Sequence, residues 1–308
     1  MKELLEYAAF RVLQLTARVL PFRVAGILGS FLGAIVYRCT PFRKSVVHDN
    51  LRAAFPGLSR GEIRRIALGA FRNYGIALVH MLWAGGQKDA VLQRVVRLAN
   101  REVFDAARAR GRGVILLSGH FGSWELLVHS VRLNLGEPAY IIVQRQRNKR
   151  IDALVNASRT LHGNVTIPMG PSAREALRAL AGGNILYALG DQSGPRESEF
   201  VSFFGRPAAT HRGVAAFSLR TGAPIVMVVL LRQPQGTYEA VFEEVDRTGL
   251  DGSSAEAIHE LTQRHASVLE RHIRRHPDHW LWMHKRWKHT GYYESHRSGE
   301  DVLHAGMA

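Results

Sequence analysis

The sequence predicts an α/β protein with a largely parallel central sheet flanked by helices and an N-terminal membrane-associating helical extension. Short apolar runs alternate with helical patterns between residues 114 and 274, which is typical of a sheet covered on both faces. No Pro/Ser-rich or low-complexity stretch divides the 308 residues. We therefore expect a helical segment over residues 1–45 and one α/β domain over residues 46–308.

The N-terminal segment contains two apolar runs, at residues 8–20 and 24–37, and the second carries no charge. A membrane-spanning helix needs roughly 20 apolar residues, and no signal-peptide cleavage pattern is present. We therefore expect shallow insertion into a membrane or peripheral attachment, with a buried core helix as the alternative. Glycines at positions 26, 29 and 33 leave one face small enough to pack closely against another helix.

The remaining elements follow from the periodicity of apolar residues. Ser59 and Glu62 have the spacing of a capping box, which predicts a helix over residues 60–83. Strands are expected at residues 114–117, 139–143, 165–167, 184–189, 224–231 and 238–245. Further helices are expected at residues 124–131, 152–161, 172–180 and 256–274.

The chain is strongly basic, with 41 Lys and Arg against 26 Asp and Glu, a formal net charge of +15. This charge is spread along the sequence and favours an anionic partner: nucleic acid, an anionic membrane, or a phosphorylated substrate with an acidic carrier protein. No zinc-finger spacing, RNP motif or helix-turn-helix supports nucleic acid. Cys39 is the single cysteine, so we expect neither disulfides nor a thiolate metal cluster, and a cytoplasm-facing location.

The first candidate site is the loop after the strand at residues 114–117. Gly119 and Gly122 give this loop conformational freedom, His120 lies between them, and Glu125 follows in the expected helix. Imidazole titrates near neutrality, and a carboxylate on its other ring nitrogen would fix the tautomer of a general base. The pair is therefore interpreted as a base and its orienting acid. A purely structural pair, or a serine nucleophile nearby, is the alternative, although the Gly-x-Ser-x-Gly elbow is absent.

Three later segments add candidates. Asp191 and Gln192 follow a strand, where ligands of α/β sheets bind. Thr210 is placed to cap a helix whose N-terminus would hold a phosphate. Residues 280–288 combine aromatics with cations, as in an interfacial belt or a core edge. Histidines 272, 276 and 279 invite a zinc interpretation, but the arginines around them disfavour it, and we expect no metal.

Seven stretches occur in an order that resembles the lipid A biosynthesis lauroyl and myristoyl acyltransferases, within the lysophospholipid acyltransferase superfamily. They are NLRAAFP (50–56), GRGVILLSGHFGSWEL (111–126), the Arg145 region, GDQ (190–192), FFGRPAATHRG (203–213), TGAPIV (221–226) and WLWMHKRWK (280–288). The resemblance covers nearly the whole chain. Where many relatives have Asn before the tryptophan, this chain has Ser123, a departure that bears on the acceptor.

The resemblance implies an O-acyltransferase with His120 and Glu125 as its catalytic motif. The substrate-binding residues that it suggests are Arg145, Arg159, Asp191, Gln192, Arg206 and Thr210. The expected donor is a thioester of acyl carrier protein or CoA, and the acceptor is a hydroxyl of an anionic glycolipid of the Kdo-lipid A type. We expect no cofactor and a place at the cytoplasmic face of the bacterial inner membrane. Acylation of another glycolipid, or of an ornithine or aryl-polyene lipid, stays open, as does a basic protein that only binds membranes or nucleic acid.

Overall fold

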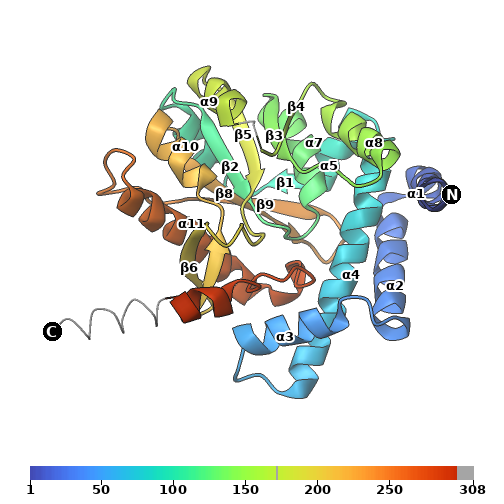
Figure 1. The fold of residues 1–308 in the computed structure, drawn as a ribbon. Coiled ribbons are helices and arrows are strands. Elements are labelled where there is room, and N and C mark those ends of the chain that lie inside the picture. Colours follow the sequence, from blue (N-terminus) through green and yellow to red (C-terminus); the bar gives the residue numbers. More distant parts are fainter. Residues whose placement is uncertain (171–172, 297–308) are drawn as a thin grey trace.

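The computed structural model describes residues 1–170 and 173–296 and contains a seven-stranded sheet in the order β1-β9-β8-β2-β5-β3-β4 (Figure 1). The strands are β1 (Val96–Leu98), β2 (Val114–Ser118), β3 (Ala139–Val143), β4 (Val165–Pro168), β5 (Ile185–Leu189), β8 (Ile225–Arg232) and β9 (Tyr238–Glu244). Neighbouring strands of this sheet run parallel, apart from the antiparallel pair of β8 and β9. The predicted fold class is confirmed.

Helices cover both faces of the sheet, and two further helices lie outside this layer at one edge of the molecule (Figure 1). The helices are α1 (Lys2–Val19), α2 (Phe22–Cys39), α3 (Lys44–Ala54), α4 (Arg60–Ala84), α5 (Asp89–Val95), α6 (Arg101–Arg108), α7 (Trp124–Leu135), α8 (Lys149–Thr160), α9 (Ala173–Ala181), α10 (Gly213–Thr221), α11 (Ala255–Arg275) and the 3-10 turn η1 (Pro277–His279). Leu117 of β2 belongs to one hydrophobic cluster and Leu116 to the other, because successive side chains of a strand point to opposite faces. This burial on both faces explains the continuous apolar runs.

Helix α4 begins at Arg60, as predicted, and α2 packs along its side. The Ser59 backbone N–H donates to Glu62 Oε2 at 2.8 Å, and the Glu62 N–H donates to Ser59 Oγ at 3.3 Å, so the capping box is confirmed. Glycines line the contact between α2 and α4. A Cβ atom on Gly75 would lie 2.1 Å from the Gly29 carbonyl oxygen, so the two backbones approach more closely than a side chain allows.

Helices α1 and α2 lie at one edge of the molecule and expose apolar side chains to solvent (Figure 1). On α2 these are Val24, Ile27, Phe31 and Ile35; on α1 they are Leu4, Leu5, Val12, Leu15 and Val19. Among the described residues, α2 is the one helix long and apolar enough to cross a membrane, with a mean hydropathy of 1.4. Only 28% of this helix is buried inside the protein, which argues against the alternative of a buried core helix.

A hairpin of β6 (Glu199–Phe203) and β7 (Arg206–Thr210) was not expected from the sequence. Its two-residue turn consists of Phe204 and Gly205, both with positive φ, of 54° and 71°. Such turns match the twist of paired strands but normally carry Asn or Gly at the first position. Phe204 is buried against Trp282 and Phe55, and this packing offsets the strained backbone.

The helix cap predicted at Thr210 is wrong, because this residue ends β7. Helix α10 begins at Gly213 with Arg212 at its N-cap position and no side-chain cap. The Thr210 hydroxyl instead donates to the Ala208 carbonyl at 3.0 Å. The hydroxyl is therefore engaged in the hairpin and does not reach the N-terminus of a helix.

Candidate active site

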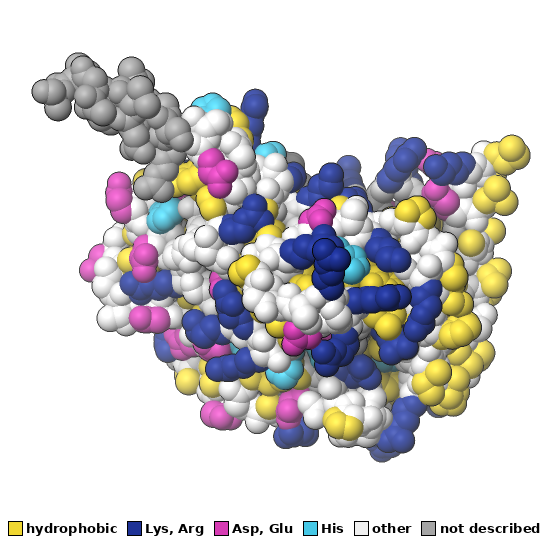
Figure 2. All heavy atoms as spheres, turned by 90° about the horizontal axis from the view of Figure 1, so that it is seen from below, with side chains coloured by type: hydrophobic (Ala, Val, Ile, Leu, Met, Phe, Trp, Pro, Cys, Tyr) yellow, Lys and Arg dark blue, Asp and Glu magenta, His cyan; other side chains and the backbone are white. Residues whose placement is uncertain are grey.

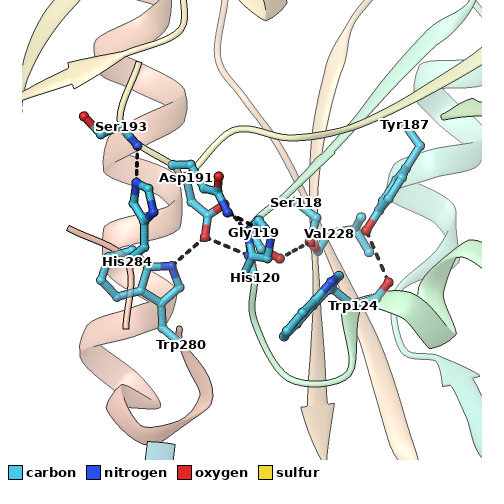
Figure 3. Close-up of polar contacts among 11 residues, drawn as sticks. Ser118, Gly119, His120, Trp124, Tyr187, Asp191, Ser193, Val228, Trp280 and His284 are labelled. Atoms are coloured by element: carbon cyan, nitrogen blue, oxygen red, sulfur yellow. Dashed lines mark hydrogen bonds and ion pairs between the residues drawn. The ribbon is translucent and has the colours of Figure 1, made fainter. Parts of the chain in front are cut away.

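The site forms where two neighbouring parallel strands end. Ser118 of β2 is in register with Leu189 of β5, and each strand is followed by a glycine and then by a polar residue. These polar residues are His120 and Asp191. Because parallel strands carry their carboxyl ends at one edge of the sheet, the register brings the two side chains together. Figure 3 shows them pointing toward each other from the two loops.

Asp191 holds His120 through two hydrogen bonds. The His120 backbone N–H donates to Oδ2 at 2.7 Å, and His120 Nδ1 lies 2.8 Å from Oδ1. The indole N–H of Trp280 donates to Oδ2 at 2.8 Å (Figure 3). Gly119 fits beside this carboxylate, since a Cβ atom there would lie 3.1 Å from Oδ2. The carboxylate that contacts the His120 ring is therefore that of Asp191, and the hydrogen bond expected with Glu125 is not formed.

The partners of His120 define its tautomer. The Asp191 carboxylate only accepts, so Nδ1 carries the proton, and the Gln192 side-chain amide lies 3.3 Å from Nε2 and can only donate to it. Nε2 is therefore the unprotonated, basic nitrogen, and it accepts this hydrogen bond from Gln192. Burial acts to lower the pKa of His120, but the charge and hydrogen bond of Asp191, with the charge of Glu125, outweigh it and leave this pKa raised.

The partners of Asp191 also define its protonation state. Burial by itself would raise its pKa, yet the His120 charge and the hydrogen bonds from His120 and Trp280 lower the pKa to about 2. The Asp191 side chain is 3% exposed and that of His120 is 16% exposed. At neutral pH Asp191 is a buried carboxylate facing an imidazole, the arrangement that stabilises an imidazolium formed during proton transfer.

Glu125 has a different partner. Arg159 of α8 donates to its two carboxylate oxygens, from Nη2 at 2.6 Å and from Nε at 3.0 Å. The two side chains are 9% and 14% exposed, so this is a buried, bidentate ion pair. Glu125 lies in the first turn of α7, while Nδ1 of His120 already faces Asp191. Nearness in sequence therefore did not make Glu125 the hydrogen-bond partner of His120.

The C-terminal aromatic segment fixes the His120 loop from the other side. The Gly122 N–H donates to the His279 carbonyl at 2.8 Å, and the Leu281 N–H donates to the His120 carbonyl at 3.0 Å. Gly122 has φ of 59°, and a Cβ atom there would lie 2.1 Å from the Leu230 carbonyl oxygen. Trp280, Trp282 and Trp287 are buried, so this segment is part of the core.

A cavity of about 580 Å³ opens beside Nε2 of His120. Its walls combine polar groups with apolar side chains of β3, β5 and the flanking loops. The lining residues are His120, Trp124, Glu125, Ile142, Val143, Gln144, Gln146, Arg159, Met169, Leu189, Gln192, Ser193, Pro195, His211, His284 and Lys288. Ser118 does not line it, because its buried hydroxyl donates to the Val228 carbonyl at 2.6 Å.

The structure brings together some of the substrate-binding residues expected from the sequence and leaves others apart. Arg159 and Gln192 line the cavity, and Asp191 lies behind His120. Arg145 is exposed after β3, and Arg206 lies over the Trp287 ring at 5.5 Å. Neither arginine lines the cavity, and neither does Thr210, whose hydroxyl accepts a hydrogen bond from buried Arg286 at 2.5 Å.

Two cavity residues were not anticipated from the sequence. His284 Nε2 accepts a hydrogen bond from the Ser193 backbone N–H at 2.9 Å and so fixes the loop that carries Gln192 (Figure 3). Lys288 places a cation at the rim. Both belong to the aromatic and cationic run at residues 280–288, and only their position next to the His120 loop reveals a role. Within the described ranges, no group of three His, Cys, Asp or Glu residues is arranged to hold a metal ion.

The fold and the site together define a class of α/β proteins in which a histidine, held by a buried carboxylate, faces a cavity at the carboxyl edge of a mostly parallel sheet. The family model described as bacterial lipid A biosynthesis acyltransferase matches residues 3–289. The chain belongs to this family of acyltransferases.

Curated relatives agree with this assignment. The chain is 28% identical over 271 residues to the lipid A biosynthesis lauroyltransferase of Escherichia coli K12, covering 87% of each chain. It is 26% identical to the lipid A biosynthesis palmitoleoyltransferase of the same strain and to a lipid A biosynthesis acyltransferase of Shigella flexneri, each over 87% of this chain and 86% of the relative.

Proposed function

We propose that this protein transfers a fatty acyl group from acyl carrier protein to a hydroxyl of a Kdo-lipid A type precursor at the cytoplasmic face of the bacterial inner membrane. Membership of the family and the activities for which the relatives are named support the reaction class. The observation that carries the proposal is the His120–Asp191 pair, which leaves Nε2 unprotonated in a residue that lines the cavity.

In this mechanism, His120 Nε2 removes the proton from the acceptor hydroxyl as its oxygen attacks the thioester carbonyl carbon. The carbonyl π electrons move onto oxygen and form a tetrahedral intermediate. Collapse of this intermediate breaks the carbon–sulfur bond, and the departing sulfur takes the proton from the His120 imidazolium. The new ester and a free thiol leave, and His120 is again neutral. Asp191 stabilises the imidazolium without exchanging a proton.

The oxyanion of the intermediate requires hydrogen-bond donors or cations. The backbone N–H groups of His120, Phe121 and Gly122 already donate to Asp191, Gly119 and His279. The oxyanion is therefore assigned to side chains in the cavity wall. Gln192, whose amide lies beside Nε2 of His120, and Lys288 are the donors that the geometry supports best.

Glu125 and Arg159 have a supporting part in this scheme. Their ion pair holds α7 and α8 together at the cavity wall, and the negative charge of Glu125 helps to raise the pKa of His120. Arg159 also presents a cation to the acceptor. Binding of substrate phosphate by Arg145 and Arg206 stays a prediction, since neither lines the cavity.

The charge of the protein and its exposed apolar surface support acyl carrier protein as the donor and the membrane surface as the location. A net charge of +15 suits both an acidic carrier protein and an anionic lipid surface. The apolar stripe of α2 ends in arginines, Arg23 and Arg38, as expected of a helix that inserts shallowly in a headgroup region. Helix α2 is fixed along α4 by its glycine face, which favours peripheral attachment over an isolated span.

Transfer of labelled acyl groups to a phosphorylated glycolipid tests the proposal directly. The purified chain should acylate the glycolipid from acyl carrier protein faster than from acyl-CoA. Mass spectrometry of glycolipids from cells with and without the protein should reveal the loss of one acyl group. Absence of transfer from either donor, together with tight sequence-tolerant DNA binding, would support the binding-protein alternative instead.

A further inference from the structure

A second cavity, of about 490 Å³, lies between α2, α4 and the turn that follows β8. It shares no lining residue with the cavity beside His120. Small residues of α2 form one wall, among them Gly26 and Ser30, and Ile76 and His80 of α4 form another. Burial lowers the pKa of His80 to about 4, so this wall is neutral and the charge of the cavity comes from elsewhere.

Four arginines supply that charge. Arg23 and Arg38 come from the two ends of α2, Arg72 from α4 and Arg232 from the end of β8, and all four line the cavity. No Asp or Glu belongs to the lining. Among the described residues, none of the four arginines forms an ion pair with a carboxylate, whereas Arg110 and Arg159 elsewhere are paired. The cavity therefore gathers four exposed cations, of which Arg232 also interacts electrostatically with Asp278, and its positive potential favours an anion.

The same cavity opens onto the apolar stripe of α2. Ile27 and Phe31 line it and are 68% and 61% exposed. Figure 2 shows hydrophobic side chains along the edge of the molecule where α1 and α2 lie, with Lys and Arg beside them. A ligand bound here would meet cations at one end and exposed apolar side chains at the other. A phospholipid has this division, with an anionic headgroup joined to acyl chains.

We propose that this cavity binds the headgroup phosphate of an anionic membrane phospholipid, with the acyl chains lying along Ile27 and Phe31. The inference rests on the membrane attachment proposed above, and it does not depend on the transferase reaction. The site would fix how the protein is oriented on the bilayer, because the headgroup contacts α2, α4 and the β8 end at once. The occupant is a bilayer lipid and is distinct from the glycolipid acceptor, which binds beside His120.

Vesicle sedimentation tests the proposal with phosphatidylcholine vesicles and with vesicles that also contain phosphatidylglycerol. The wild-type chain should prefer the anionic vesicles. The double variant Arg72→Ala/Arg232→Ala should bind them about 30-fold more weakly, since each cation near an anionic surface contributes about a fivefold change in partitioning. Its binding to phosphatidylcholine should be unchanged, because the apolar stripe is intact.

Two further variants make the test specific. Arg112→Ala/Arg220→Ala removes the same charge from exposed positions of another cavity and should change anionic binding less than threefold, an order-of-magnitude expectation from screened distant charge. Ser30→Phe fills the arginine-lined cavity without changing charge. In calorimetry with a soluble short-chain phosphatidylglycerol, the wild type should bind about one molecule and Ser30→Phe should bind none, by the size argument for such pockets.

The outcomes separate the two proposals. If the Arg72/Arg232 and Arg112/Arg220 variants lose anionic binding equally, or if Ser30→Phe still binds the short-chain lipid, the headgroup site is wrong while membrane attachment stands. If the wild type binds neither vesicle, the attachment itself fails. A raised KM for the glycolipid acceptor in Arg72→Ala/Arg232→Ala, measured in neutral micelles, would assign the cavity to the acceptor and overturn the phospholipid assignment.

Discussion

Two residue pairs contribute side chains to the same cavity and differ in how they carry charge. His120–Asp191 joins residues 71 positions apart, and Glu125–Arg159 joins residues 34 positions apart. The first contains an imidazole, the side chain suited to accept and release a proton, and its pKa is raised beside Asp191, whereas the second joins a guanidinium to a carboxylate. The proposed function therefore assigns proton transfer to the first pair and a supporting role in the cavity wall to the second.

Removal of the base should have the largest effect. We expect His120→Ala to lower the transfer rate by about 10⁴-fold, the upper end of what a positioned base contributes. Labelled acyl carrier protein and glycolipid provide the assay, and the thermal midpoint of unfolding serves as the control for folding. A variant that folds and retains a rate near that of the wild type would contradict the role of His120.

Asp191→Asn should have the next largest effect, a decrease in the transfer rate on the order of 10³-fold, because an amide can donate to Nδ1 and favour the wrong tautomer of His120. The base acts when it is unprotonated, so kcat/KM rises as pH passes through the pKa of His120. Asp191 helps to raise that pKa, so the acid limb of the wild-type profile should lie above pH 6.5. In Asp191→Asn the acid limb of the kcat/KM profile should move to lower pH. An acid limb at the wild-type position would contradict the proposed effect of Asp191 on the pKa of His120.

The variant Glu125→Gln compares the Glu125–Arg159 pair with the His120–Asp191 pair. It leaves Arg159 buried without a carboxylate, so we expect a loss of about 3 kcal/mol in the free energy of unfolding in urea. The transfer rate should fall less than in Asp191→Asn, by roughly 30-fold, because the variant removes only a negative charge near His120 and leaves the hydrogen bond to Asp191 intact. Glu125→Gln/Arg159→Met should recover most of the stability. A larger rate loss in Glu125→Gln than in Asp191→Asn would make Glu125 the orienting acid.

Trp280→Phe should have the smallest effect. It keeps an aromatic ring in the core and removes one hydrogen bond to Asp191. Such bonds to charged groups contribute about 1.5–3 kcal/mol, so we expect about a tenfold decrease in kcat with little change in KM. The acid limb of the pH profile should shift slightly toward higher pH, since the Asp191 carboxylate then attracts the proton on His120 more strongly. A change in KM alone would indicate a structural role in the cavity wall.

Most of the large sheet could be predicted from the sequence because its strands are apolar runs, continuous in β2 and β8 and alternating in β9. Tyr238–Glu244 and Ala139–Val143, for example, lie within a residue of the expected ranges. The hairpin was missed because Phe204 occupies a turn position where Asn or Gly is the usual signal, and it is retained there by buried aromatic packing. The three-residue strand β1 is too short for its alternation to be recognised.

The candidate site was predicted in part for a related reason. His120 and Asp191 both follow apolar strands and were both selected, but their pairing depends on β2 lying beside β5. Strand order is a property of the whole sheet, so no local pattern could choose Asp191 over Glu125 as the partner of His120. Likewise, Trp280 and His284 are ordinary core and loop residues until the fold brings them to the His120 loop.

The contact between Gly29 and Gly75 has a mechanical consequence. A Cβ atom on Gly75 would lie 2.1 Å from the Gly29 carbonyl oxygen, so a larger residue at this position would force α2 away from α4. Under the membrane attachment proposed above, such a replacement would displace the exposed apolar stripe of α2 relative to the His120 cavity. The reactants would then be misaligned while every residue of the site itself remained intact.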